Sequence, residues 1–109
     1  MNQPKISVII PVFNGEKFIA EAIQSVREQN YKPLEIIVID DGSTDNTMDV
    51  VKSLGGEVVI FSQPNKGVAA ARNAGLERAT GDLITFIDAD DMWLQNKLHQ
   101  QTSILNNNP

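Results

Sequence analysis

Two short groups of aspartates are the residues of this sequence best suited to chemistry. Asp40 and Asp41 follow one apolar run, and Asp88, Asp90 and Asp91 follow another. These five residues account for the whole net charge of -5, because the other nine acidic residues balance nine Lys and Arg. Carboxylates gathered at one place repel each other unless a cation lies among them. Carboxylate oxygens without nearby His or Cys favour Mg²⁺ or Mn²⁺, which commonly keep coordination positions for substrate phosphates.

Four apolar runs predict the strands that position these aspartates, at residues 6–10, 34–39, 58–61 and 83–87. The runs are continuous and rich in Val and Ile, which is typical of strands covered on both faces of a parallel sheet. Apolar residues at helical spacing predict helices between them, at residues 18–26, from a Ser43 cap to the glycines at 55–56, at about 68–79, and more weakly at 94–105. Met48, Val51 and Leu54 form the inner face of the second helix. This alternation of strands and helices predicts an open α/β sheet with right-handed crossovers.

The polar segments that follow the strands are expected to share one edge of the sheet. They are residues 11–14, 40–43, 63–67 and 88–91. Ligands of open α/β sheets bind outside the carboxyl ends of the strands. Both aspartate groups fall at such ends, so we predict that they meet there. The alternative interpretation is that these aspartates only form Asx turns and helix caps.

Two further features of this edge allow more than one interpretation. Asn65, Lys66 and Gly67 lead into the third helix, so their backbone N–H groups could face an anion or form an ordinary turn. Arg72 lies about one turn inside that helix and could pair with a strand-end aspartate, reach a phosphate, or be solvated. We expect Asp40, the last residue of its strand, to orient its neighbours or to pair with Arg72.

Composition excludes several classes of protein. The chain has 109 residues, 41% of them hydrophobic, which predicts one globular domain. It contains no cysteine, so a disulfide framework, a zinc–thiolate site and a cysteine nucleophile are excluded. It has no run of Lys and Arg that would favour nucleic acid as a partner, and no apolar stretch long enough to span a membrane. The glycine patterns of dinucleotide-binding folds, P-loops and α/β-hydrolases are also missing from the sequence.

Four segments, in order and at matching spacing, resemble the N-terminal half of family 2 glycosyltransferases. They are residues 8–14 (VIIPVFN), 37–45 (IVIDDGSTD), 65–75 (NKGVAAARNAG) and 86–91 (FIDADD). The resemblance extends from Ile6 to about Leu105. It implies the GT-A fold of nucleotide-diphospho-sugar transferases, a three-layer α/β/α sandwich with a mainly parallel sheet in the order 3-2-1-4.

The resemblance also implies a set of site residues. Asp41 matches the aspartate that recognises uracil, Asp88 takes the ribose side of the DXD motif, and Asp90 is the metal ligand, with Asp88 beside it. The ion would be Mn²⁺ or Mg²⁺. The residues expected to bind the donor are Pro11, Val12, Phe13, Asn14, Glu16, Asp41, Asn65, Gly67, Arg72, Asp88 and Ala89.

The activity implied is inverting transfer of a sugar from a nucleotide diphosphate, UDP above all, to a hydroxyl of a saccharide or lipid-linked acceptor. Such a protein would act in cell-envelope polysaccharide or glycoconjugate synthesis, in the cytoplasm or at the inner face of the membrane, and could form a homodimer. The catalytic base of the family lies downstream. Residues 1–109 are therefore interpreted as one domain, the donor-binding half of a longer transferase, and the isolated chain is expected to be inactive in transfer.

Two other function classes are considered. A receiver-like signalling module also gathers aspartates and Mg²⁺ at strand ends, but it needs an aspartate where this chain has Gln63. A nucleotide-binding scaffold without activity would differ only in lacking the downstream base. If the chain proved active alone, the base would have to be Glu16, Asp45 or Asp91.

Overall fold

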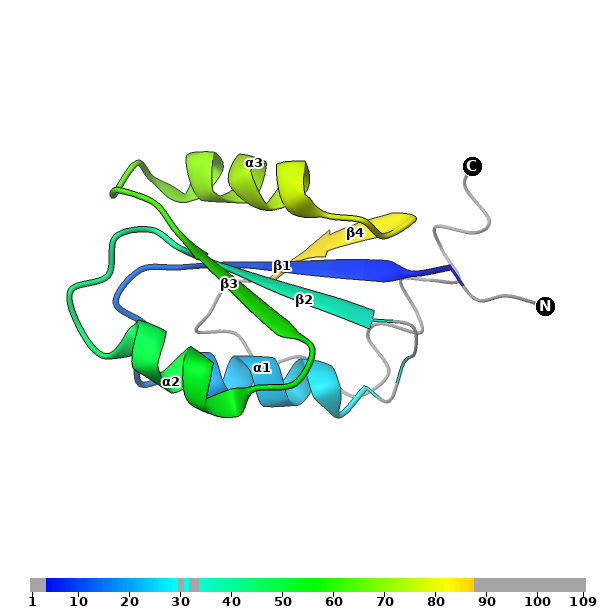
Figure 1. The fold of residues 1–109 in the computed structure, drawn as a ribbon, viewed down its shortest axis with the longest axis horizontal. Coiled ribbons are helices and arrows are strands. Elements are labelled where there is room, and N and C mark those ends of the chain that lie inside the picture. Colours follow the sequence, from blue (N-terminus) through cyan, green and yellow to red (C-terminus); the bar gives the residue numbers. More distant parts are fainter. Residues whose placement is uncertain (1–3, 30, 32–33, 88–109) are drawn as a thin grey trace.

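The computed structural model describes residues 4–29, 31 and 34–87. Four parallel strands form one sheet in the order β3-β2-β1-β4, which confirms the predicted order (Figure 1). Three helices connect the strands. The elements along the chain are β1 Ile6–Val12, α1 Ile19–Arg27, β2 Leu34–Asp40, α2 Thr47–Leu54, β3 Val58–Ser62, α3 Val68–Arg78 and β4 Leu83–Phe86.

The two central strands, β1 and β2, carry most of the buried surface. All seven residues of β1 and the last five of β2 are buried. The strands pair in register from Ile6 opposite Leu34 to Val12 opposite Asp40, so the ladder extends past the predicted apolar runs into the polar residues that follow them. As a result, Asp40 is the last paired residue of β2, and Asp41 follows directly after the end of the strand.

Helices cover both faces of the sheet and produce the three predicted layers. Figure 1 shows α1 and α2 on one face and α3 on the other. Val8, Ile10 and Val38 belong to the larger core under α1 and α2, whereas Ile9 and Ile37 belong to the smaller core under α3. Successive residues of a strand point to opposite faces, so each buried run supplies both cores.

Small residues let α3 lie close to β1. Ala71 and Gly75 are the buried residues of this helix. A Cβ atom added at Gly75 would overlap the side chain of Ile9. The close approach fixes the helix on the sheet, and therefore fixes the loop that precedes it.

The start of α2 differs from the prediction. The helix begins at Thr47 with Asn46 at the N-cap position, so Ser43 does not cap it. The Ser43 hydroxyl instead accepts a hydrogen bond of 2.7 Å from the backbone N–H of Asn14. This bond joins two loops, and a partner in another loop competes with a local cap for the same oxygen. The predicted inner face is confirmed at Val51, which is 2% exposed. The predicted fourth helix, at 94–105, lies outside the described residues.

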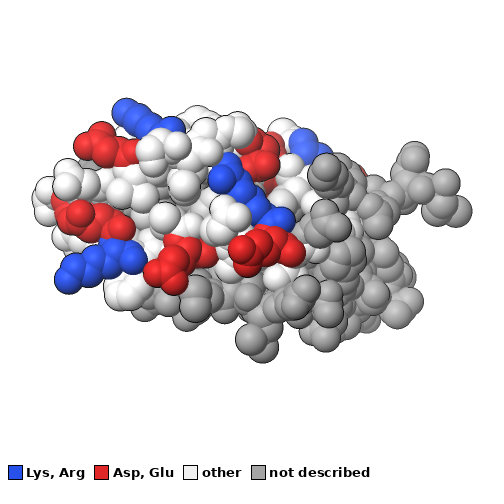
Figure 2. Space-filling view, turned by 90° about the horizontal axis from the view of Figure 1, so that it is seen from below, with Lys and Arg blue, Asp and Glu red and all other residues white. Residues whose placement is uncertain are grey.

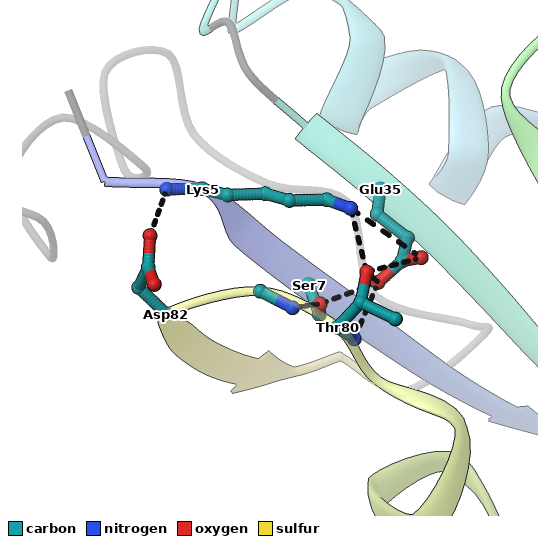
Figure 3. A network of polar contacts seen from close by, with 6 residues as sticks. Lys5, Ser7, Glu35, Thr80 and Asp82 are labelled. Atoms are coloured by element: carbon teal, nitrogen blue, oxygen red, sulfur yellow. Dashed lines mark hydrogen bonds and ion pairs between the residues drawn. The ribbon is translucent and has the colours of Figure 1, made fainter. Parts of the chain in front are cut away.

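A polar network, here called the amino-edge network, ties together the starts of β1, β2 and β4. It consists of Lys5, Ser7, Glu35, Thr80 and Asp82 (Figure 3). Glu35 accepts hydrogen bonds from the Ser7 hydroxyl at 2.6 Å and from the Thr80 backbone N–H at 3.0 Å. Burial raises the pKa of the Glu35 carboxyl, but these hydrogen bonds and the charge of Lys5 outweigh it and lower the pKa below its ordinary 4.5.

The surface over α1 and α2 carries both signs of charge. Figure 2 shows Lys and Arg side chains interspersed with Asp and Glu among the residues drawn in colour. Interspersed charges of both signs give little net attraction for a polyanion. Among the described helices, none has the length and apolar character required to cross a bilayer.

Candidate functional site

The loops that follow β1, β2 and β3 gather at one edge of the sheet, on the left in Figure 1. We call this the carboxyl edge and define it as residues 13–18, 41–46 and 63–67. Parallel strands place their carboxyl ends together, so the topology alone brings these three loops side by side. Hydrogen bonds then connect the loops in two seams, one on each side of the β2 loop.

Asp41 forms the seam between the β2 and β3 loops. Its Oδ1 atom accepts hydrogen bonds of 2.8 Å from the Gln63 side-chain amide and 2.8 Å from the Lys66 backbone N–H. Its Oδ2 atom accepts one of 3.0 Å from the Gly67 backbone N–H. Burial, with 5% of the residue exposed, raises the pKa of Asp41, but these three bonds outweigh it and lower the pKa below its ordinary 3.8. Asp41 is therefore held as a carboxylate.

This arrangement decides between the two interpretations of the third loop. The sequence left open whether the backbone N–H groups before α3 face an anion or form an ordinary turn. In the structure, the N–H groups of Lys66 and Gly67 face the Asp41 carboxylate of the chain itself. The negative charge at the start of α3 is thus supplied by the β2 loop, which lies against the β3 loop that leads into this helix.

Gly42 permits the close approach of these loops. Its φ of +80° lies in the left-handed region, and a Cβ atom there would come within 2.8 Å of the Asn65 backbone nitrogen. The Asn65 side-chain amide donates to the Asp41 backbone carbonyl at 3.1 Å. A side chain at residue 42 would separate the two loops and remove this contact.

Asn14 forms part of the second seam, between the β1 and β2 loops. It adopts a left-handed φ of +50°. Its backbone N–H donates to Ser43, and its side-chain oxygen accepts a hydrogen bond of 2.8 Å from the Thr44 backbone N–H. Asparagine tolerates the left-handed region better than most residues, so its type fits this position.

Thr47 and Asp45 complete the second seam. The Thr47 side chain, fully buried, accepts a hydrogen bond of 3.0 Å from the Gly15 backbone N–H and donates to the Asp45 carboxylate. Asp45 also accepts from the backbone N–H groups of Thr47 at 3.0 Å and Glu16 at 3.3 Å. Desolvation raises the pKa of Asp45, but these bonds outweigh it and lower the pKa below its ordinary 3.8. Both oxygens are engaged, so Asp45 is a poor alternative for the catalytic base.

Asp40 does not pair with Arg72 in the structure, which makes that part of the expectation wrong. Asp40 is 3% exposed, and its Oδ1 atom has no hydrogen-bond partner in the described part of the chain. Strand alternation places Asp40 on the face of Val38, toward α1 and α2, whereas α3 covers the other face. The Arg72 guanidinium lies over the ring of Phe86, 5.7 Å from its centroid.

The other predicted site residues divide into three groups. Pro11 and Val12 are buried and are the last two residues of β1, directly before the β1 loop of the carboxyl edge. Phe13, which is 51% exposed, lies at the surface of the edge, as do the exposed residues Glu16, Asn65 and Gly67. The predicted residues Asp88, Ala89, Asp90 and Asp91 lie outside the described residues. Over residues 4–29, 31 and 34–87, the structure has no cluster of three or more His, Cys, Asp or Glu suited to a metal ion.

Two contributors to the edge, Gln63 and Thr47, were missed by sequence reasoning. Gln63 was considered only as a residue of a polar loop and as the mismatch to the aspartate of a receiver, and Thr47 was not singled out. Neither lies in a periodic pattern, because their roles depend on partners 22 and 32 residues away in the chain. The turn-forming residues Ser43, Thr44 and Asp45 before Thr47 were the one local signal of such bonding.

A comparison with protein families matches residues 7–109 to the model described as glycosyl transferase family 2. An uncharacterized glycosyltransferase of Haemophilus influenzae is 44% identical over 109 residues, which cover 96% of this chain and 44% of the relative. The putative teichuronic acid biosynthesis glycosyltransferase TuaG of Bacillus subtilis is 36% identical, and the match covers 94% of this chain and 42% of TuaG. The chain therefore spans less than half the length of these relatives.

Solved structures of similar fold confirm the predicted GT-A type of sandwich. Residues 1–349 of TarS from S. aureus, in complex with UDP-GlcNAc, superpose with a TM-score of 0.86 at 30% identity, over 94% of this chain and 31% of that one. The mannosyltransferase PcManGT from Pyrobaculum calidifontis, in complex with GDP-Man and Mn²⁺, gives a TM-score of 0.83 at 30% identity, over 90% of this chain and 31% of that one.

Proposed function

The chain belongs to glycosyl transferase family 2, and we propose that its carboxyl edge binds the nucleotide-diphosphate sugar, UDP-linked, of an inverting transferase. The observation that carries this proposal is the Asp41 carboxylate, which three hydrogen bonds hold ionised at the end of a central strand. Beside the same strand ends, the exposed ring of Phe13 offers an apolar surface for a flat base. The Asp41 carboxylate would accept a hydrogen bond from an N–H group of the base, and the Phe13 ring would pack against the face of the base.

We further propose that Asp90, with Asp88 beside it, holds Mn²⁺ or Mg²⁺. The match to a structure containing GDP-Man and Mn²⁺ supports this assignment. When bound, the ion would neutralise the diphosphate as it leaves. A chain with a net charge of -5 would otherwise repel such an anion. The described residues contribute by binding and orienting the donor, through Asp41 and the interlocked loops.

The rest of the reaction is assigned to residues beyond this chain. We propose that residues 1–109 are the donor-binding half of a longer domain, which fits their match to less than half of each relative. The hydroxyl of a saccharide or lipid-linked acceptor, and the base that deprotonates it, would lie with the remainder. The similarity to TuaG supports a role in cell-envelope polysaccharide synthesis. We propose that the whole protein acts in the cytoplasm or at the inner face of the membrane, and that it could dimerise.

The receiver-like alternative does not fit a chain that belongs to the transferase family. A receiver module would have a phosphoacceptor aspartate at the end of its third strand. Here Gln63 follows β3 and donates its amide to Asp41. The residue at this position thus supports the Asp41 carboxylate instead of accepting a phosphoryl group.

Calorimetry tests the proposed binding of donor and metal. We expect UDP to bind the chain when Mn²⁺ is present, and EDTA to abolish the heat of binding, because the diphosphate needs a neutralising cation. Asp90→Asn should weaken the manganese dependence more than Asp40→Asn, since Asp40 lies on the face of the sheet toward α1 and α2. Equal UDP affinity with and without metal would contradict the metal assignment, and similar losses in both variants would contradict the ranking.

A further inference from the structure

The Asp41 carboxylate has a limited number of positions for a ligand. An ionised carboxylate offers about four lone-pair positions, two on each oxygen. Oδ1 already accepts two hydrogen bonds, from Gln63 and from the Lys66 backbone. Oδ2 accepts one, from the Gly67 backbone. Counting the donors among the described residues, one acceptor position therefore remains, and it is on Oδ2.

The side-chain amide of Gln63 is the only side-chain donor among these three. Its backbone N–H also donates to the Asp40 carbonyl at 2.9 Å, which anchors the residue directly after β3. The amide of Gln63 must present its NH₂ group to Asp41, because a carboxylate can only accept. Replacing this one side chain would free a position on Oδ1, while both backbone bonds could stay in place.

Nucleobases differ in the number of donors they can offer to a carboxylate. The edge of uracil presents one N–H group between two carbonyl oxygens. Guanine presents a ring N–H and an exocyclic NH₂ group side by side, which suit both oxygens of one carboxylate. With Oδ1 filled, a guanine bound at Asp41 would leave one donor without a partner, and a buried unpaired donor weakens binding.

We infer that Gln63 is a specificity-determining residue, which leaves Asp41 one acceptor and thereby favours uracil over guanine in the donor. The inference rests on the proposed function, since it requires a nucleotide at the carboxyl edge. Structures similar to this chain hold UDP-GlcNAc in one case and GDP-Man in another. A fold that serves both bases must choose between them through local contacts, and the Gln63–Asp41 bond is such a contact.

The test measures UDP and GDP affinities of the chain by calorimetry, with Mn²⁺ present throughout. Gln63→Met keeps the length of the side chain and removes the amide, and Gln63→Leu serves as a second variant should the first fold poorly. We expect the unaltered chain to prefer UDP. In the variants, the UDP-to-GDP affinity ratio should fall about tenfold, mainly because GDP binds more tightly. Arg78→Leu is the matched control, because Arg78 packs over Phe61 of β3 without contacting Asp41.

The outcomes separate this inference from the proposed function. Arg78→Leu should lower the melting temperature and keep the UDP-to-GDP affinity ratio. If the unaltered chain binds both nucleotides equally, or if both Gln63 variants keep its ratio, the inference is wrong while the donor site stands. If the unaltered chain binds neither nucleotide, the proposed function itself is contradicted.

Discussion

A single buried hydroxyl, that of Thr47, joins the first two loops of the carboxyl edge. It accepts from Gly15 and donates to Asp45, so two loops 32 residues apart depend on one atom. A buried polar group that loses its partner carries a desolvation penalty, and here removal of the hydroxyl would leave partners on both loops unsatisfied. The position is thus sensitive although it touches no proposed ligand.

We expect Thr47→Val to lower the free energy of unfolding by about 1–2 kcal/mol, because it removes two hydrogen bonds and keeps the side-chain shape. Urea denaturation measures the loss. Thr44→Val is the matched control, since the Thr44 hydroxyl is exposed and its bond to Asn14 is long, at 3.4 Å. An equal loss in the two variants would contradict the seam described above. Thr47→Ser should recover most of the stability.

The residue pattern predicted that Asp41 lies at the carboxyl edge, but it could not predict what Asp41 or Asp40 contacts. The second aspartate group, Asp88, Asp90 and Asp91, lies outside the described residues. Asp41 was correctly placed at the end of the second strand. Its partners come from the β3 loop, 22 to 26 residues further along the chain, and no local spacing encodes them. Asp40 is the opposite case. Strand alternation alone would have separated it from Arg72, because α3 covers the other face.

At the scale of the elements, the amino-edge network holds β4 beside β1. β4 pairs with β1 over only four residues, from Leu83 opposite Ile6 to Phe86 opposite Ile9. The backbone N–H groups of Asp82 and Leu83 both donate to the Lys5 carbonyl, and Asp82 accepts from the Lys5 backbone. Glu35 adds β2 to the same junction through Ser7 and Thr80 (Figure 3). A short strand is thereby fixed in register.

This junction predicts a dependence of stability on pH. The pKa of Glu35 is lower in the folded chain than its ordinary 4.5, so the unfolded chain binds the proton more readily. The contribution of Glu35 is therefore fully present above about pH 4.5 and is lost as the pH falls through the lower folded value. Glu35→Gln should lower the free energy of unfolding by about 1–2 kcal/mol at neutral pH.

The free energies of unfolding of the unaltered chain and of Glu35→Gln, measured by denaturation between about pH 7 and pH 2, check this prediction. The difference between the unaltered chain and Glu35→Gln should shrink at the acidic end, because the protonated acid resembles the amide. Glu77→Gln, which changes an exposed acid on α3, serves as the control and should track the unaltered chain. A difference that stays constant over the whole range would exclude Glu35 as the source.

The elements were predictable because their signals are local. Continuous Val and Ile runs identified β1 and β2, and apolar residues at helical spacing identified α1. The start of α2 was not predictable, because Ser43 has the right type for a cap but bonds to Asn14 instead. Only the assembled sheet brings the β1 loop close enough to compete for that hydroxyl.

At the scale of the whole molecule, hydrogen bonds join the three loops of the carboxyl edge, and we propose that the base that activates the acceptor lies beyond this chain. Asp45 is fully engaged, and Glu16 is an exposed side chain. We therefore expect the 109-residue chain to transfer no sugar to an acceptor. Loss of a general base alone typically slows a reaction by about 10²–10⁴-fold, and loss of acceptor positioning adds to this.

The comparison that checks this expectation uses the chain and a version extended by the downstream reading frame. Both are incubated with UDP-sugars and a panel of saccharide and lipid-linked acceptors. Slow hydrolysis of the donor by water could persist in the shorter chain, because water needs no acceptor site. Comparable transfer by both proteins would contradict the assignment of residues 1–109 as the donor-binding half.

The central claim, that the carboxyl edge binds a nucleotide diphosphate, is tested most directly by an NMR titration of the ¹⁵N-labelled chain with UDP and Mg²⁺. The amides of Lys66 and Gly67, which surround Asp41, and of Asn14 in the neighbouring loop should shift with added UDP. The amides of Asp82 and Leu83, at the opposite edge of the sheet, should stay in place. Shifts confined to the amino edge, or none at saturating UDP, would contradict the claim.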